Sequence, residues 1–213
     1  MAGRLALMHR IYLELGPKKV FACSLDWPGW CRVDRSEEPA IDRLTDYAPR
    51  YRVIAERAGL DFAPGEPVVV ERVKGSSTTD FGAPDAEPSA DAEPAGPATL
   101  ARDVALLRAA WALFDQTAAA TPEELRKGPR GGGRDRTRMV EHVTEAERAY
   151  ARRLGVRYPP YRSVADRDAM REELAALLLE GGSGTWSTRY ACRRVAWHVI
   201  DHLWEMEDRR SFS

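Results

Sequence analysis

The chain has 213 residues, of which 44 % are hydrophobic and 31 % are charged, and its formal net charge is −1. This composition is that of a globular protein and excludes disordered and fibrous classes. A nearly neutral chain has no excess of cations to neutralise phosphates, so we expect neither a nucleic acid nor an anionic membrane as partner. No apolar run approaches the roughly 20 residues that span a bilayer. We therefore expect a cytoplasmic protein.

The number of cysteines also favours a cytoplasmic protein. The chain contains Cys23, Cys31 and Cys192. An odd number this small does not make a disulfide scaffold, so we expect reduced thiols, as in a cytosolic protein.

The region 81–98 separates two parts of the chain. It holds six Ala, four Pro and four acidic residues, with no Lys or Arg and little to bury. This composition predicts an acidic linker. The chain then divides into an N-terminal domain over 1–80 and a C-terminal domain over 99–213.

In chain order, the N-terminal domain begins with a predicted β-hairpin. Apolar residues alternate over 10–15 and 19–25, on either side of a Gly-Pro turn. A helix is expected from Ser36 to Gly59, and the apolar run 68–70 predicts another strand. The fold class expected for this domain is α+β, with a small antiparallel sheet and one helix.

The C-terminal domain shows four helical stretches with apolar residues three or four apart. They cover about 99–120, 135–154, 163–181 and 186–209. Four helices over roughly 115 residues predict an all-α, up-and-down four-helix bundle, whose core is a usual place for a metal or cofactor.

Three of the four histidines lie on these predicted helices. His198 and His202 are four residues apart, so their side chains lie on the same helical face, and His142 lies on another helix. Three imidazoles with open coordination positions are typical of a catalytic divalent metal site. The alternative is three unrelated histidines, two of them solvated and one packed near the core.

Each of these histidines is followed by an acid three residues later, namely Glu145, Asp201 and Glu205. Such a carboxylate could orient a ligating imidazole or act as a general acid or base. In a chain this rich in charge, each could equally be a solvated surface residue.

A glycine-rich segment, residues 128–135, comes just before the second of these helices. Its Arg130 and Arg134 could bind a substrate carboxylate. The other interpretation is an ordinary surface connection, because the segment lacks the spacing and the lysine of a phosphate-binding loop.

The segments 139–150 and 193–209 carry a family resemblance. With His142 in the first and the HxxxH of His198 and His202 in the second, residues 99–210 resemble the DinB-like (YfiT-like) four-helix superfamily. The resemblance implies a divalent metal, often zinc or nickel, held by these three histidines. It further implies a metal-dependent enzyme, such as a thiol S-transferase or isomerase, that activates a low-molecular-weight thiol or water and acts on a small molecule.

The N-terminal domain resembles another family. Residues 12–15, residues 19–33 with the motif Asp-Trp-Pro-Gly, and the helix from Ser36 resemble the HicB-like β-β-β-α-β module. In HicB antitoxins such a module blocks a partner protein. The resemblance therefore implies an alternative, a non-catalytic regulatory or partner-binding protein whose helical part is a scaffold or forms a homodimer.

Overall fold

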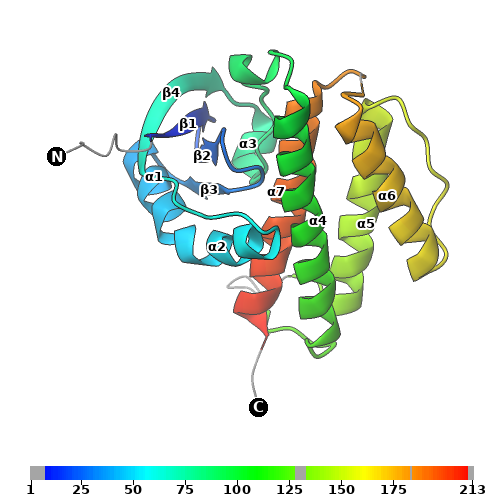
Figure 1. Cartoon of the computed structure of the whole chain (residues 1–213). Coiled ribbons are helices and arrows are strands. Elements are labelled where there is room, and N and C mark those ends of the chain that lie inside the picture. Colours follow the sequence, from blue (N-terminus) through cyan, green and yellow to red (C-terminus); the bar gives the residue numbers. More distant parts are fainter. Residues whose placement is uncertain (1–7, 128–132, 183, 211–213) are drawn as a thin grey trace. The chain divides into compact units, whose positions relative to one another are not determined.

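The computed structural model describes residues 8–127, 133–182 and 184–210 (Figure 1). The chain divides into two compact units, Met1–Pro94 and Ala95–Ser213. The first unit is built on a sheet and the second on helices, so the chain as a whole is mixed α and β.

A four-stranded sheet forms the first unit, in the order β3-β2-β1-β4. The strands are β1 (Met8–Leu15), β2 (Val20–Ser24), β3 (Cys31–Asp34) and β4 (Glu66–Lys74). The predicted hairpin is confirmed, since β1 pairs antiparallel with β2, and the N–H of Gly16 bonds the carbonyl of Lys19 across the turn.

The expectation of an antiparallel sheet is wrong at one edge, because β4 pairs parallel with β1 from Met8↔Glu66 to Leu15↔Lys74. A parallel pair needs a crossover connection, which is usually helical. Here the chain between β3 and β4 carries α1 (Glu37–Asp46) and α2 (Ala48–Arg57) and supplies that crossover.

These two helices replace the single helix expected from Ser36 to Gly59. The break falls at Tyr47, and Pro49 follows in the first turn of α2. Proline has no N–H to continue a preceding helix and its ring clashes with the preceding turn, whereas the start of a helix tolerates both. Pro49 therefore sets the boundary between α1 and α2.

Aromatic side chains fill the core between the sheet and these helices. The ring of Trp30 lies 4.6 Å from the imidazole of His9, 5.6 Å from the ring of Tyr51 and 5.2 Å from that of Phe62, measured between centroids. Trp27 meets Phe62 edge to face at 4.8 Å. Such stacked and edge-to-face contacts add to the free energy gained by burial alone.

His9, the one histidine outside the helical unit, is a core residue. It is 2 % exposed, and its Nε2 lies 2.7 Å from the hydroxyl of Ser24. Burial lowers the pKa of His9 to about 4, an effect that the nearby carboxylate of Asp26 partly opposes. This imidazole is therefore neutral in the folded protein at neutral pH.

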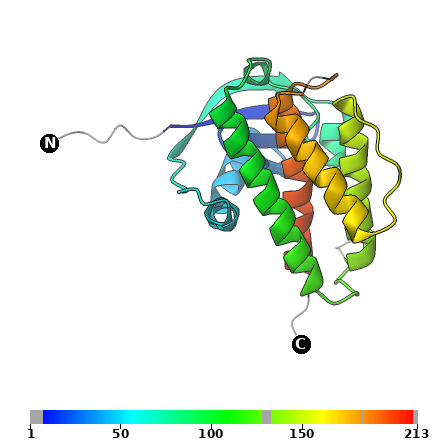
Figure 2. The ribbon, with the colours of Figure 1, turned by 45° about the vertical axis from the view of Figure 1, so that its right-hand side comes forward.

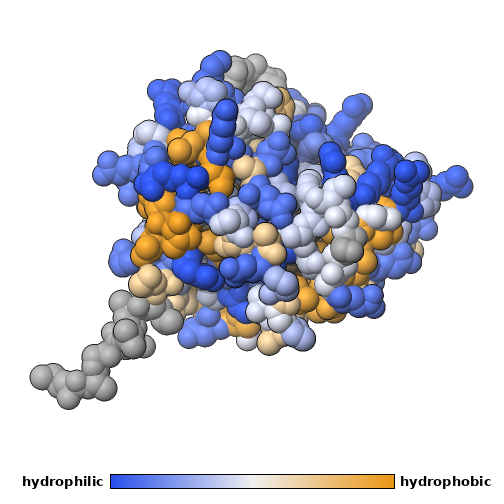
Figure 3. Space-filling view, turned by 90° about the horizontal axis from the view of Figure 1, so that it is seen from above, coloured by the Kyte–Doolittle hydropathy of each residue, from blue (hydrophilic) through white to orange (hydrophobic). Residues whose placement is uncertain are grey.

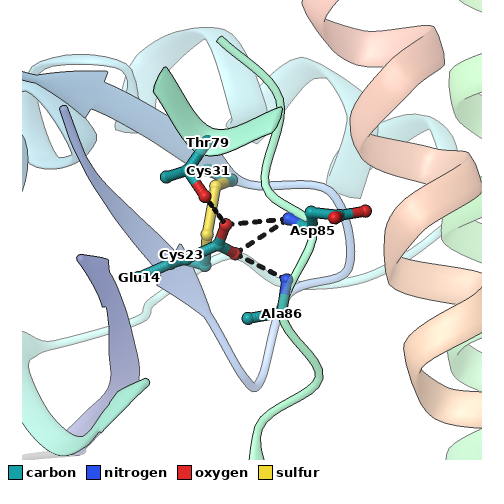
Figure 4. Close-up of a disulfide and its surroundings, with 6 residues drawn as sticks. All are labelled: Glu14, Cys23, Cys31, Thr79, Asp85 and Ala86. Atoms are coloured by element: carbon teal, nitrogen blue, oxygen red, sulfur yellow. Dashed lines mark hydrogen bonds between the residues drawn. A yellow bond between two sulfur atoms is a disulfide. The ribbon is translucent and has the colours of Figure 1, made fainter. Parts of the chain in front are cut away.

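Most of the predicted linker is bound to the first unit. After the short helix α3 (Ser77–Phe81), the N–H groups of Asp85 and Ala86 donate to the carboxylate of Glu14, 2.9 and 3.0 Å away (Figure 4). The Thr79 hydroxyl donates to the same carboxylate, which is fully buried, and burial raises the pKa of Glu14. The first unit therefore extends past residue 80, and the second begins near the start of α4.

The expectation of reduced thiols is wrong for one pair of cysteines. Cys23 on β2 lies directly opposite Cys31 on β3, with their Cα atoms 4.2 Å apart, and the structure joins them in a disulfide (Figure 4). Residue counts do not reveal this pairing, because it depends on the register of the two strands. Cys192 is a buried free thiol.

Four helices make up the described part of the second unit and confirm the four helical stretches expected from the sequence. They are α4 (Pro97–Ala119), α5 (Arg136–Arg153), α6 (Val164–Leu179) and α7 (Thr188–Arg209). Helices α4 and α5 each pack against both α6 and α7 (Figures 1 and 2). The hydroxyls of Ser163 and Ser187 cap the N-termini of α6 and α7.

A buried ion pair ties α5 to α6. The carboxylate of Glu147 is fully buried and accepts hydrogen bonds from the guanidinium of Arg171 at 3.0 and 3.2 Å. Arg171 also bonds Asp115 of α4, 3.0 Å away. The charges of this group are thus satisfied inside the unit, as buried ions require.

Hydrophilic side chains cover most of the face seen in Figure 3, with hydrophobic groups between them. Among the described residues, the exposed large hydrophobic side chains come from several elements of both units: Met8, Val53, Val70, Phe81, Val164 and Leu179. Among the helices that the structure describes, none combines the length and the hydropathy needed to cross a bilayer.

Candidate metal centre

Two helices of the second unit bring His142, His198 and His202 together. The first lies on α5 and the other two lie one turn apart on α7. One nitrogen from each imidazole can be chosen so that all three lie within 4.8 Å of one another. Ring centroids of the three pairs are 4.7 to 5.0 Å apart.

One pair of these nitrogens has the spacing expected for two ligands of one metal ion. Nε2 of His198 lies 3.2 Å from Nε2 of His142. Two imidazole nitrogens that each bind zinc at about 2.0–2.1 Å in a tetrahedral arrangement lie about 3.3 Å apart. The three residues could therefore hold a divalent ion through three nitrogens, which would leave at least one coordination position for water or substrate.

Burial keeps two of these imidazoles, those of His142 and His198, in the neutral form that binds metal. His198 is 6 % exposed, and burial lowers its pKa well below the usual value, with further lowering by the neighbouring histidines and by Arg194. Burial also lowers the pKa of His142 to about 4, and the charge of Arg134 adds to this effect. A neutral imidazole has the lone pair that a metal needs.

Among the three acids expected from the sequence, Glu205 is bonded to the cluster. Its carboxylate lies 2.8 Å from Nδ1 of His202 and accepts a second bond, of 2.6 Å, from Arg209. A proton held on Nδ1 toward Glu205 leaves Nε2 of His202 free as a ligand. Burial raises the pKa of Glu205, but its bonds to His202 and Arg209 outweigh burial and lower the pKa overall.

The other two acids lie outside the group of mutually close ligand atoms. Glu145 is bonded to Arg148 of its own helix, at 2.5 and 3.1 Å, and its side chain is 44 % exposed. Asp201 is partly exposed on α7.

The two arginines expected to bind substrate differ in what the structure says of them. Arg134 is exposed just before α5, and its charge acts on both His142 and His198. Arg130 lies outside the described residues.

The sequence analysis missed one residue beside the cluster. Arg194 is 8 % exposed on α7 and lies against the rings of Tyr150 and Trp197. The signal was its place four residues before His198, which continues the face that carries His198 and His202.

Comparisons with known proteins return no match of any kind: no family model fits the chain, and no curated protein or solved structure matches it.

Proposed function

We propose that the second unit is a DinB-like four-helix bundle and that the chain is a divalent-metal-dependent enzyme. His142, His198 and His202 would hold zinc or nickel. The observation that carries the proposal is the 3.2 Å separation between Nε2 of His198 and Nε2 of His142, within a cluster of three imidazoles. Two imidazole nitrogens come this close either through an N–H···N hydrogen bond or as ligands of one ion, and a third imidazole beside them favours the ion.

The residues around the cluster have distinct tasks in this proposal. When bound, the ion would lower the pKa of a thiol or water at its open position and so supply a nucleophile at neutral pH. Glu205 holds the proton on Nδ1 of His202 and fixes the orientation of that ring. His142 is partly exposed, which leaves the cluster open to solvent on its side.

The decisive experiment is metal analysis of the purified protein, followed by assays with a panel of low-molecular-weight thiols and small electrophiles. We expect about one zinc or nickel per chain, lost in His198→Ala and in His142→Ala. Thiol consumption should require the ion and disappear in the same variants. Stoichiometric metal that remains in both variants would contradict this assignment.

We also propose that the first unit is a HicB-like module. The supporting observation is its element order, in which three strands are followed by helices and then by a fourth strand. The corresponding alternative function is a regulatory or partner-binding protein. It predicts that a partner protein co-purifies with the full chain and that the metal and thiol assays are negative.

A further inference from the structure

Arg194 lies directly beside the histidine cluster. It precedes His198 by one helical turn on α7, so the two side chains are neighbours about 6 Å apart on one face. The centre of its guanidinium is 5.1 Å from the ring of Tyr150 and 4.6 Å from that of Trp197. Both rings also contact the imidazole of His198, at centroid distances of 5.7 and 5.9 Å.

Two of the three guanidinium nitrogens of Arg194 are buried without a hydrogen-bond acceptor. Its Nε and Nη1 atoms are inaccessible to solvent and have no hydrogen-bond partner within the described residues. Aromatic rings stack on the faces of a guanidinium, but its N–H groups point outward in the plane and still need acceptors.

Two other buried arginines of this unit are paired with carboxylates. Arg167 bonds Asp115 at 2.8 Å, and Arg171 bonds both Asp115 and Glu147. A buried cation without an anion is costly, since it has lost its hydration and gained no partner. Two N–H-bearing nitrogens of Arg194 therefore lack an anionic partner, and they lie about one helical turn from His198.

We propose that Arg194 binds the carboxylate of a small-molecule substrate whose reacting end lies at the histidine cluster. This inference rests on the proposed function and defines its substrate class. The carboxylate would be separated from the reacting atom by about one helical turn, or roughly 5–6 Å. The rings of Tyr150 and Trp197 offer apolar surface to the carbon chain between these two ends.

Two thiols of equal length test the proposal on the cobalt-loaded full chain. Cobalt(II) reports on the histidines through its visible absorption, and a bound thiolate adds a charge-transfer band that can be titrated. We expect 3-mercaptopropionate to bind roughly 10- to 100-fold more tightly than 3-mercaptopropanol, as expected for one charge-assisted contact. The comparison uses the unaltered protein and does not depend on a variant that folds.

Variants then assign the preference to Arg194. Arg194→Gln should bind both thiols with equal affinity, whereas Arg152→Gln, which removes an exposed arginine of α5, should keep the preference. Should Arg194→Gln fail to fold, Arg194→Lys keeps the charge but loses the planar group, and the preference should fall several-fold.

The outcomes separate this inference from the proposed function. Equal binding of the two thiols by the unaltered protein would overturn the inference. A preference that persists unchanged in Arg194→Gln or Arg194→Lys would also overturn it, because the carboxylate would then bind a group other than Arg194. Failure of cobalt to bind at the histidines would instead overturn the proposed function.

Discussion

The indole nitrogen of Trp111 donates a 2.7 Å hydrogen bond to Oε1 of Glu147, a carboxylate with no exposed surface. Arg171 bonds both oxygens of the same carboxylate and lies 5.3 Å from the Trp111 ring. Three helices thus contribute to one buried polar group. This group stabilises the fold only when all its members are present, because a buried charge or polar group left without its partner destabilises the folded state.

We expect Glu147→Gln to lower the free energy of unfolding by about 3 kcal/mol, because the buried charge of Arg171 loses a partner. The matched control is Glu172→Gln, which removes an exposed carboxylate paired with Arg108. That change should cost less than about 1 kcal/mol. Urea denaturation of the unaltered protein and the two variants measures the free energy of unfolding. Equal losses of this free energy in the two variants would show that the buried carboxylate contributes no more to stability than the exposed one.

Glu205→Gln should weaken metal binding by about 10-fold, since it removes the negative charge that holds the proton on Nδ1 of His202. Competition with a coloured chelator measures the affinity. Glu145→Gln provides the control, because that carboxylate is bonded to Arg148. If both variants retain the affinity of the unaltered protein, Glu205 has no role in orienting the ligand.

Acidification should destabilise the first unit through His9. Its pKa is about 4 in the folded protein against 6.5 in the unfolded chain, so the unfolded state takes up a proton first as the pH falls. The stability that His9 confers is complete above pH 6.5 and declines between about 6.5 and 4, by at most about 3 kcal/mol.

The measurement is an NMR titration of the His9 imidazole, together with urea unfolding of the unaltered protein and of His9→Phe over this pH range. The difference between the two proteins isolates His9 from the histidines of the second unit. An imidazole that titrates near pH 6.5 would refute the assignment.

Glu14→Gln should loosen the segment after α3, because a neutral amide is a weaker acceptor for the N–H groups of Asp85 and Ala86. We expect a loss of about 1–3 kcal/mol in stability and faster amide hydrogen exchange at both residues. Glu71→Gln is the control, since Glu71 binds the N–H of Ser89 at an exposed position. Unchanged exchange at Asp85 and Ala86 would show that Glu14 does not hold this segment.

Local patterns in the sequence were sufficient for the hairpin and for the four helices of the second unit. Both depend on the spacing of nearby apolar residues and on turn or cap residues such as Gly16 and Ser163. The HxxxH spacing also predicted that His198 and His202 share a face, although nothing in the sequence could give the distance from either residue to His142.

The features that the sequence did not predict are non-local. The parallel pairing of β4 with β1 joins residues more than 50 positions apart, and the disulfide depends on the register of β2 and β3. Composition marked residues 81–98 as a linker because their side chains offer little to bury. Their attachment uses backbone N–H groups, which every residue except proline carries, so composition has no signal for it.

The position of β1 in the sheet also affects how the chain folds as it is made. The hairpin of β1 and β2 can pair as soon as it leaves the ribosome, because its contacts are local. Glu14 receives its last donor only when Ala86 has emerged, by which time β4 is also free to pair. Folding of the first unit during translation is therefore complete only shortly before α4 of the second unit leaves the ribosome, and until then the central strand has an unpaired edge.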